Sequence, residues 1–194
     1  MFINNTRFQE IDARDLRQSA FHECGHSLVG RHYGAGCSPS IWRTGTNNPK
    51  KERLWVGTTR HDSSCLTPDE CRQIALAGEM AVWIEENGGP DECIVQSLCT
   101  RIERTRKHSY RISNWSRTDW EKSQGWTTAD VHAVYIILKK NWKELVAEAR
   151  ELIRLAKEDG NCAKDPDEIH HFWDYVIPGY SDLVAQALAE YKAS

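Results

Sequence analysis

Apolar residues recur at steps of three and four along most of this chain, the spacing that lines one face of an α-helix. The pattern predicts a first helix from a cap at Asp12 or Asp15 to Gly34, and further helices over about 68–86, 91–104 and 127–158. The last of these keeps its apolar spacing almost unbroken and is interpreted as one helix. Shorter helices are expected within 105–126, after Asp165 and after Ser181.

Two short segments, residues 37–43 and 53–60, interrupt the helical pattern and are typical of strands. The residues between them are rich in Gly, Asn and Pro, which favour turns. We therefore expect a mainly α fold with a small antiparallel β element. A chain of 194 residues can bury a core in one domain. We divide it into a core over 1–125 and a C-terminal helical part over 126–194, packed on the same domain.

The first predicted helix carries His22-Glu23-Cys24-Gly25-His26, an HExxH motif. Residues four apart on a helix lie about 40° apart around the axis and about 6 Å along it, so both histidines can bind one metal ion. Glu23 is turned away from the pair, next to the place of a metal-bound water. Zinc lowers the pKa of such a water to about 7, and a glutamate can then take its proton. The motif predicts a zinc hydrolase, most often a peptidase, in an HExxH zincin-type helical domain.

Charge and composition narrow the expected partners. The net charge is −3, so no overall positive field favours nucleic acid. Basic and aromatic residues alternate within 101–118, but a solvated surface explains that stretch better than a nucleic-acid site. No apolar stretch is long enough to span a bilayer, no N-terminal signal pattern occurs, and the seven cysteines form no CxxC pair. We expect a cytoplasmic protein with reduced thiols and no membrane partner.

Four segments together resemble the zinc peptidase domain of the FtsH family of ATP-dependent membrane proteases. Residues 21–29 are similar to the HEAGHA-type helix of that family, and a strand-turn-strand segment follows in both. Residues 74–81 are similar to its LAGRAAE-type helix. Residues 127–131 are similar to the segment that carries its third zinc ligand. The resemblance spans about residues 18–158.

This resemblance implies a zinc-dependent metalloendopeptidase in which His22, His26 and Asp130 bind Zn²⁺ and Glu23 is the general base. The chain has no GxxxxGK[ST] phosphate loop, so the ATPase of that family is missing. Peptides or unfolded chains are then the expected substrates. A homo-oligomer is left open, because domains of that family form hexameric rings.

The third ligand has several candidates besides Asp130, which can also be explained as an acid that complements a helix dipole. Asp119 is the next candidate, although Ser116 three residues earlier explains it as part of a helix cap. Glu79, which replaces an arginine of the family, would suit a site with two histidines and a glutamate. His32 has the spacing of a third histidine but lacks the glycine that such a motif requires.

A second function stays open beside the peptidase. A degenerate, catalytically inactive peptidase-like fold can serve as a partner-binding module, and the missing ATPase permits it. In that case His22 and His26 are core histidines with ordinary hydrogen bonds.

Overall fold

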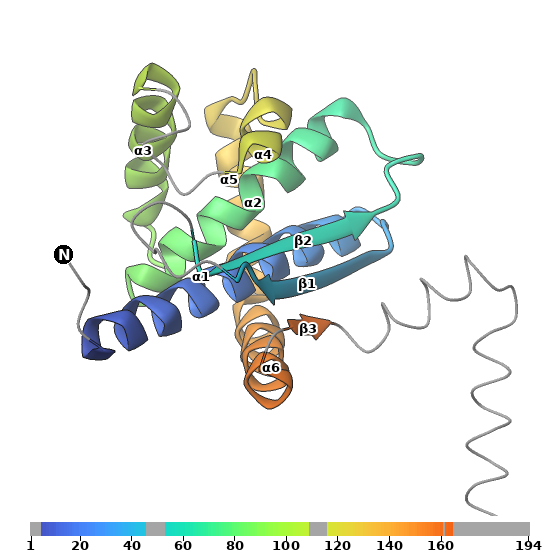
Figure 1. The fold of residues 1–194 in the computed structure, drawn as a ribbon. Helices are drawn as coiled ribbons and strands as arrows, with labels where there is room; N and C mark the ends of the chain where they lie inside the picture. Colours follow the sequence, from blue (N-terminus) through green and yellow to red (C-terminus); the bar gives the residue numbers. More distant parts are fainter. Residues whose placement is uncertain (1–4, 46–52, 109–115, 161, 165–194) are drawn as a thin grey trace, which may run out of the picture.

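The structure is a computed structural model that describes residues 5–45, 53–108, 116–160 and 162–164 (Figure 1). Within these residues the chain is mainly helical with a small antiparallel sheet, as the sequence predicts. The elements are, in order, α1 (Asn5–His32), β1 (Cys37–Arg43), β2 (Trp55–His61), α2 (Pro68–Glu86), α3 (Ile94–His108), α4 (Arg117–Lys122), α5 (Thr128–Lys140), α6 (Trp142–Asp159) and β3 (Cys162–Lys164). None of the helices in these ranges is long and apolar enough to cross a membrane.

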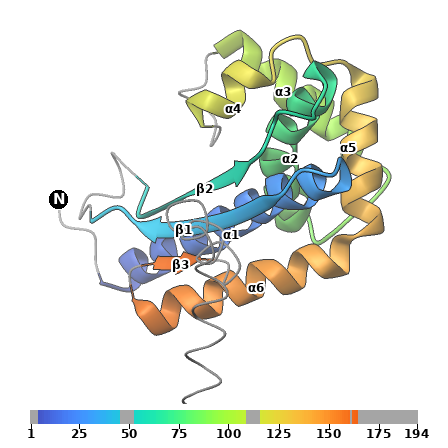
Figure 2. The same cartoon turned by 90° about the vertical axis from the view of Figure 1, so that its right-hand side faces the viewer.

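Helix α1 is the centre of the fold, since it contacts α2, α6 and the first two strands. Gly25 allows α1 and α2 to approach closely. A Cβ atom at this position would lie 2.7 Å from the Ala77 carbonyl oxygen and 2.7 Å from the Ala81 side chain. Helices α4 and α6 lie on opposite sides of the layer formed by α1 and the sheet (Figure 2). The middle of α1, with its HExxH motif, is therefore held between α2 and the sheet.

The sheet has the order β2-β1-β3, so β2 forms one edge of it among the described residues. The Thr44 N–H donates to the Leu54 carbonyl at 3.0 Å, and β2 pairs antiparallel with β1. Main-chain groups alternate in direction along such a strand, so those of Gly57 and Thr59 point away from β1. Within the described ranges no further strand pairs with this edge, which lies beside the motif. The third strand was not predicted.

Helix α1 begins at Asn5, well before the predicted caps Asp12 and Asp15. Both carboxylates bind the start of β2 instead. Asp15 Oδ2 accepts from the Leu54 N–H and Asp12 Oδ1 accepts from Trp55 Nε1, each at 3.0 Å. These acids therefore fix the strand on α1 and do not cap the helix.

The prediction of one helix over 127–158 is wrong, because the chain turns at Asn141 between α5 and α6. Asn141 has φ −109° and ψ 19°, and its side chain donates to the Ile137 carbonyl at 2.9 Å. An asparagine side chain that competes for main-chain partners favours such a helix end. Helix α5 then packs mainly on α2, whereas α6 packs on α1 and on the sheet. The helices predicted after Asp165 and Ser181 lie outside the described residues.

Candidate metal centre

His22 and His26 project from the same face of α1 and meet Asp119 of α4. The Nε2 atoms of the two histidines are 3.0 Å apart. Asp119 Oδ2 lies 3.0 Å from Nε2 of His22 and 3.3 Å from Nε2 of His26. All three side chains are largely shielded from solvent. The structure thus brings both predicted histidines together with one of the alternative acids.

The three ligand atoms have the separation that a zinc ion requires. With Zn–N and Zn–O bonds of about 2.0–2.1 Å, neighbouring ligands of a tetrahedral site lie about 3.3 Å apart. The three distances here are 3.0, 3.0 and 3.3 Å, close to one face of such a tetrahedron. Two imidazoles and one carboxylate also form a ligand set typical of catalytic zinc, with a fourth position left for water. The three side chains could therefore hold a metal ion, and the same distances are also those of hydrogen bonds among them.

The surrounding chain fixes the orientation of the histidines. His26 Nδ1 lies 2.6 Å from the Ile74 carbonyl oxygen, which can only accept a hydrogen bond. His26 therefore carries a proton on Nδ1 and presents Nε2 to the site. Gly78 of α2 packs against both rings. A Cβ atom there would lie 2.5 Å from His26 Nε2 and 2.8 Å from His22 Cε1, so this position admits no side chain.

The charge of Asp119 favours a protonated His26 when no metal is bound. Burial lowers the pKa of His26, but the Asp119 carboxylate outweighs this and raises the pKa to about 9. Burial raises the pKa of Asp119, but the charges and hydrogen bonds of both histidines hold it far below its usual range. A metal ion would have to displace the proton of His26. Metal affinity is therefore expected to rise with pH.

Glu23 lies beside the histidines and is held by β2. The Thr59 hydroxyl lies 2.9 Å from Oε2 of Glu23 and 2.9 Å from its main-chain carbonyl oxygen. Gly57 leaves the space that the carboxylate occupies, because a Cβ atom there would lie 2.4 Å from Glu23 Cγ. Among the residues that the structure describes, Oε1 of Glu23 makes no hydrogen bond. One carboxylate oxygen is thus positioned and the other is left for a ligand.

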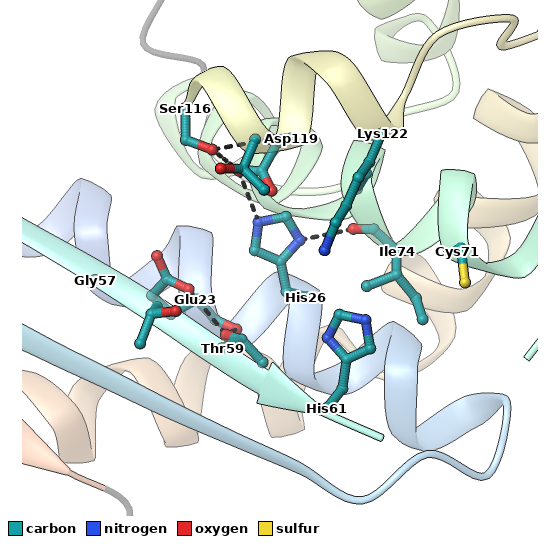
Figure 3. Close-up of a pocket in the computed structure, with 13 residues that line it drawn as sticks. Glu23, His26, Gly57, Thr59, His61, Cys71, Ile74, Ser116, Asp119 and Lys122 are labelled. Carbon is teal, nitrogen blue, oxygen red and sulfur yellow. Dashed lines mark hydrogen bonds and ion pairs between the residues drawn. The ribbon is translucent and has the colours of Figure 1, made fainter. Parts of the chain in front are cut away.

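These groups line a pocket of about 230 Å³ between the edge of β2 and helix α4 (Figure 3). Its polar lining includes Glu23, His26, Thr59, His61, Asp119 and Lys122. A group that enters this pocket reaches Glu23, His26 and Asp119.

Asp130, the third ligand that the resemblance implies, is not brought to the histidines. Its carboxylate accepts hydrogen bonds from Arg72 Nε at 3.1 Å and from Gln73 Nε2 at 2.9 Å. It also accepts from the Thr127 N–H at 2.8 Å in a capping box at the start of α5. Among the described residues, the group of metal-binding side chains contains Asp119 and not Asp130.

The other two alternatives also lie outside the cluster. Glu79 is buried beside it and pairs with Arg101 at 2.6 Å, and Arg101 in turn stacks on Trp83 at 4.3 Å. Burial raises the pKa of Glu79, although Arg101 opposes this. His32 is exposed in the last turn of α1. Arg101 belongs to the basic stretch 101–118, and its charge is paired with Glu79 within the fold.

Three residues of the site were not predicted: Thr59, His61 and Lys122. The two in β2 had a usable signal. The alternation of a strand places Gly57, Thr59 and His61 on one face, which here faces α1. Lys122 follows Asp119 by three residues in α4 and so shares its side of the helix.

No protein-family model matches this chain, and no curated protein matches it.

Proposed function

We propose that this chain is a zinc-dependent metallopeptidase that cleaves peptides or unfolded chains. The observation that carries the proposal is the triangle of His22, His26 and Asp119 beside the positioned carboxylate of Glu23. The FtsH-like pattern of the sequence supports the same reaction class. In this proposal Asp119 takes the place that the resemblance gives to Asp130.

His22, His26 and Asp119 would hold the ion, which supplies a polarised, easily deprotonated water and a Lewis acid for the scissile carbonyl. Glu23 would take the proton of that water, while Thr59 keeps Oε2 in place. The protonated Glu23 would then donate to the leaving amine.

The free edge of β2 supports an extended peptide as substrate. The main-chain groups of Gly57 and Thr59 point away from β1, next to Glu23. An extended chain can add to such an edge by main-chain hydrogen bonds, which give affinity with little dependence on sequence. A substrate in which one amide at this edge is replaced by an ester should bind more weakly than its all-amide counterpart.

The test combines zinc analysis with cleavage of a panel of unfolded proteins and labelled peptides. Wild type should bind one zinc per chain and cleave in a zinc-dependent way. Glu23→Gln should retain the zinc and lose about 10² to 10⁴ in rate, the usual contribution of a general base. Equal cleavage by Glu23→Gln and wild type would contradict the mechanism. Bound zinc with no cleavage of any substrate would favour a partner-binding module.

A further inference from the structure

His61 and Lys122 lie on the side of the pocket away from Glu23 (Figure 3). His61 is the last residue of β2, and Lys122 is the last residue of α4, one turn after Asp119. Figure 3 shows the Lys122 chain reaching from α4 into the space above His61. Two nitrogen-bearing side chains from separate elements therefore converge beside the metal centre.

The His61 ring interacts with the main chain of Thr59, but its buried Nδ1 atom has no partner within hydrogen-bond geometry. Within the described ranges, Lys122 forms no ion pair. Burial and the positive charges of Lys122 and His26 lower the pKa of His61. A ligand atom that pairs with the buried Nδ1 would relieve the cost of leaving it without a partner.

The nearby acids are already engaged. Asp119 faces the two histidines and Glu23 is bound by Thr59. Asp62, next to His61 in the chain, is exposed and accepts a hydrogen bond from the Ser64 N–H at 2.9 Å. With a divalent ion at the metal centre, the charges of the pocket would sum to a positive value. The pocket therefore favours an anionic group on its ligand.

We propose that His61 and Lys122 form a subsite that binds a carboxylate of the substrate. The proposal rests on the proposed function, because the subsite belongs to the same pocket. A lysine supplies a point charge and an imidazole N–H supplies a directed hydrogen bond, the two contacts that a carboxylate accepts. The carboxylate comes either from a free C-terminus or from an acidic side chain close to the scissile bond.

Four peptides of otherwise identical sequence separate these two sources. They carry a free or an amidated C-terminus, and Glu or Gln at the residue after the scissile bond. Loss of the required carboxylate should raise KM by about tenfold to a hundredfold, as expected for hydrogen bonds to a charged group. Preference for the free C-terminus identifies a carboxypeptidase-like use of the subsite. Preference for Glu identifies an acidic side chain.

Lys122→Met should abolish the preference, and His61→Gln should reduce it. Lys157→Met, an exposed lysine at the end of α6, is the matched control and should behave as wild type. A preference that persists in both Lys122→Met and His61→Gln would place the carboxylate on the metal and overturn the proposal. Wild type that cleaves all four peptides with equal KM would overturn it as well.

A binding arm keeps this result separate from the failure of the peptidase proposal. Zinc-loaded Glu23→Gln is titrated with the same four labelled peptides, and the dissociation constants are compared with those of Glu23→Gln/Lys122→Met. A carboxylate preference that depends on Lys122, without cleavage by wild type, supports the subsite and contradicts the peptidase. Cleavage by wild type without any carboxylate preference supports the peptidase and contradicts the subsite.

Discussion

Asp119 and Asp130 occupy the same position in two copies of one local motif, yet their surroundings give them different chemistry. Each is the third residue of a short helix. The Asp119 N–H donates to Ser116 Oγ at 3.0 Å, and the Asp130 N–H donates to Thr127 Oγ1 at 3.2 Å. A Ser or Thr cap followed by an acid three residues later is a common helix start. The two helix starts differ locally in one bond: Asp130 also accepts from the Thr127 N–H, which completes a capping box that α4 lacks.

What differs is the element that each carboxylate faces. Asp119 faces the histidines of α1, whereas Asp130 faces Arg72 and Gln73 of α2. Burial raises both pKa values, and in both cases the partners reverse this effect. Around Asp119 the partners can exchange a proton for a metal ion. Around Asp130 they are a permanent cation and an amide, so that site is an ion pair that joins α5 to α2.

The largest expected difference between substitutions of Asp119 and Asp130 is in zinc affinity. Asp119→Asn removes a ligand and should weaken zinc binding by more than the about 10- to 100-fold that loss of an outer partner costs. Asp130→Asn should leave zinc affinity unchanged. Competition with a chromophoric chelator measures both. Weaker zinc binding by Asp130→Asn alone would reverse the assignment of the third ligand.

A substitution on α2 should disturb the histidines that face Asp119 and leave the Asp130 ion pair intact. Gly78→Ala would place a methyl group within 2.8 Å of both histidine rings, and overpacking of this kind costs about 1–3 kcal/mol. Zinc affinity should fall by about tenfold or more, the effect of disturbed ligand orientation. Gly36→Ala is the control, because a Cβ atom there meets no atom within 4 Å. Equal zinc affinity in Gly78→Ala and wild type would contradict the tight packing described here.

Loss of the Asp130 ion pair should lower the free energy of unfolding, by an amount that depends on pH. Hydrogen bonds from Arg72, Gln73 and Thr127 lower the pKa of Asp130 to about 2, against about 3.9 in an unfolded chain. This stabilisation is complete above the unfolded pKa and is lost as pH falls toward 2. Asp130→Asn should therefore lower the free energy of unfolding by about 1–2 kcal/mol at pH 7, and by less at pH 3.

Urea unfolding of the metal-free protein at both pH values measures this effect. The same measurement on Asp119→Asn gives the contribution of Asp119 to the free energy of unfolding at both pH values. The loss of unfolding free energy in Asp130→Asn should be smaller at pH 3 than at pH 7. A larger loss at pH 3 would contradict the ion-pair assignment.

The smallest effect concerns the positioning of Glu23. Thr59→Val removes the hydroxyl that binds Oε2 and keeps the shape of the side chain. A hydrogen bond to a charged group contributes about 1.5–3 kcal/mol at most, so kcat should fall by about tenfold. Zinc affinity should stay as in wild type, while the midpoint of unfolding should fall, because the same hydroxyl also binds the Glu23 main-chain carbonyl. A loss of zinc together with activity would mean that Thr59 supports the metal ligands and not Glu23.

The features predicted from the sequence are those that depend on neighbours in the chain. His22 and His26 share a face because of helix geometry alone, and α2 starts at Pro68 as predicted, after a capping box of Thr67 and Glu70. The strands predicted over 37–43 and 53–60 are found at Cys37–Arg43 and Trp55–His61. Such features need no information about the rest of the fold.

The features that were missed depend on packing between distant segments. The choice between Asp119 and Asp130 is made by α1 and α2, which lie far from both acids in the sequence. Asp12 and Asp15 resemble helix caps, but the start of β2 takes their carboxylates. The helix break at Asn141 is the exception, because it rests on a local bond from one side chain to the Ile137 carbonyl within an otherwise continuous apolar pattern.

Anomalous diffraction at the zinc edge, from crystals of the zinc-loaded protein, tests the central claim most directly. The account predicts one zinc ion bound by Nε2 of His22, Nε2 of His26 and a carboxylate oxygen of Asp119, with Asp130 still paired to Arg72. A zinc ion bound by Asp130, or no zinc peak near the two histidines, would contradict it.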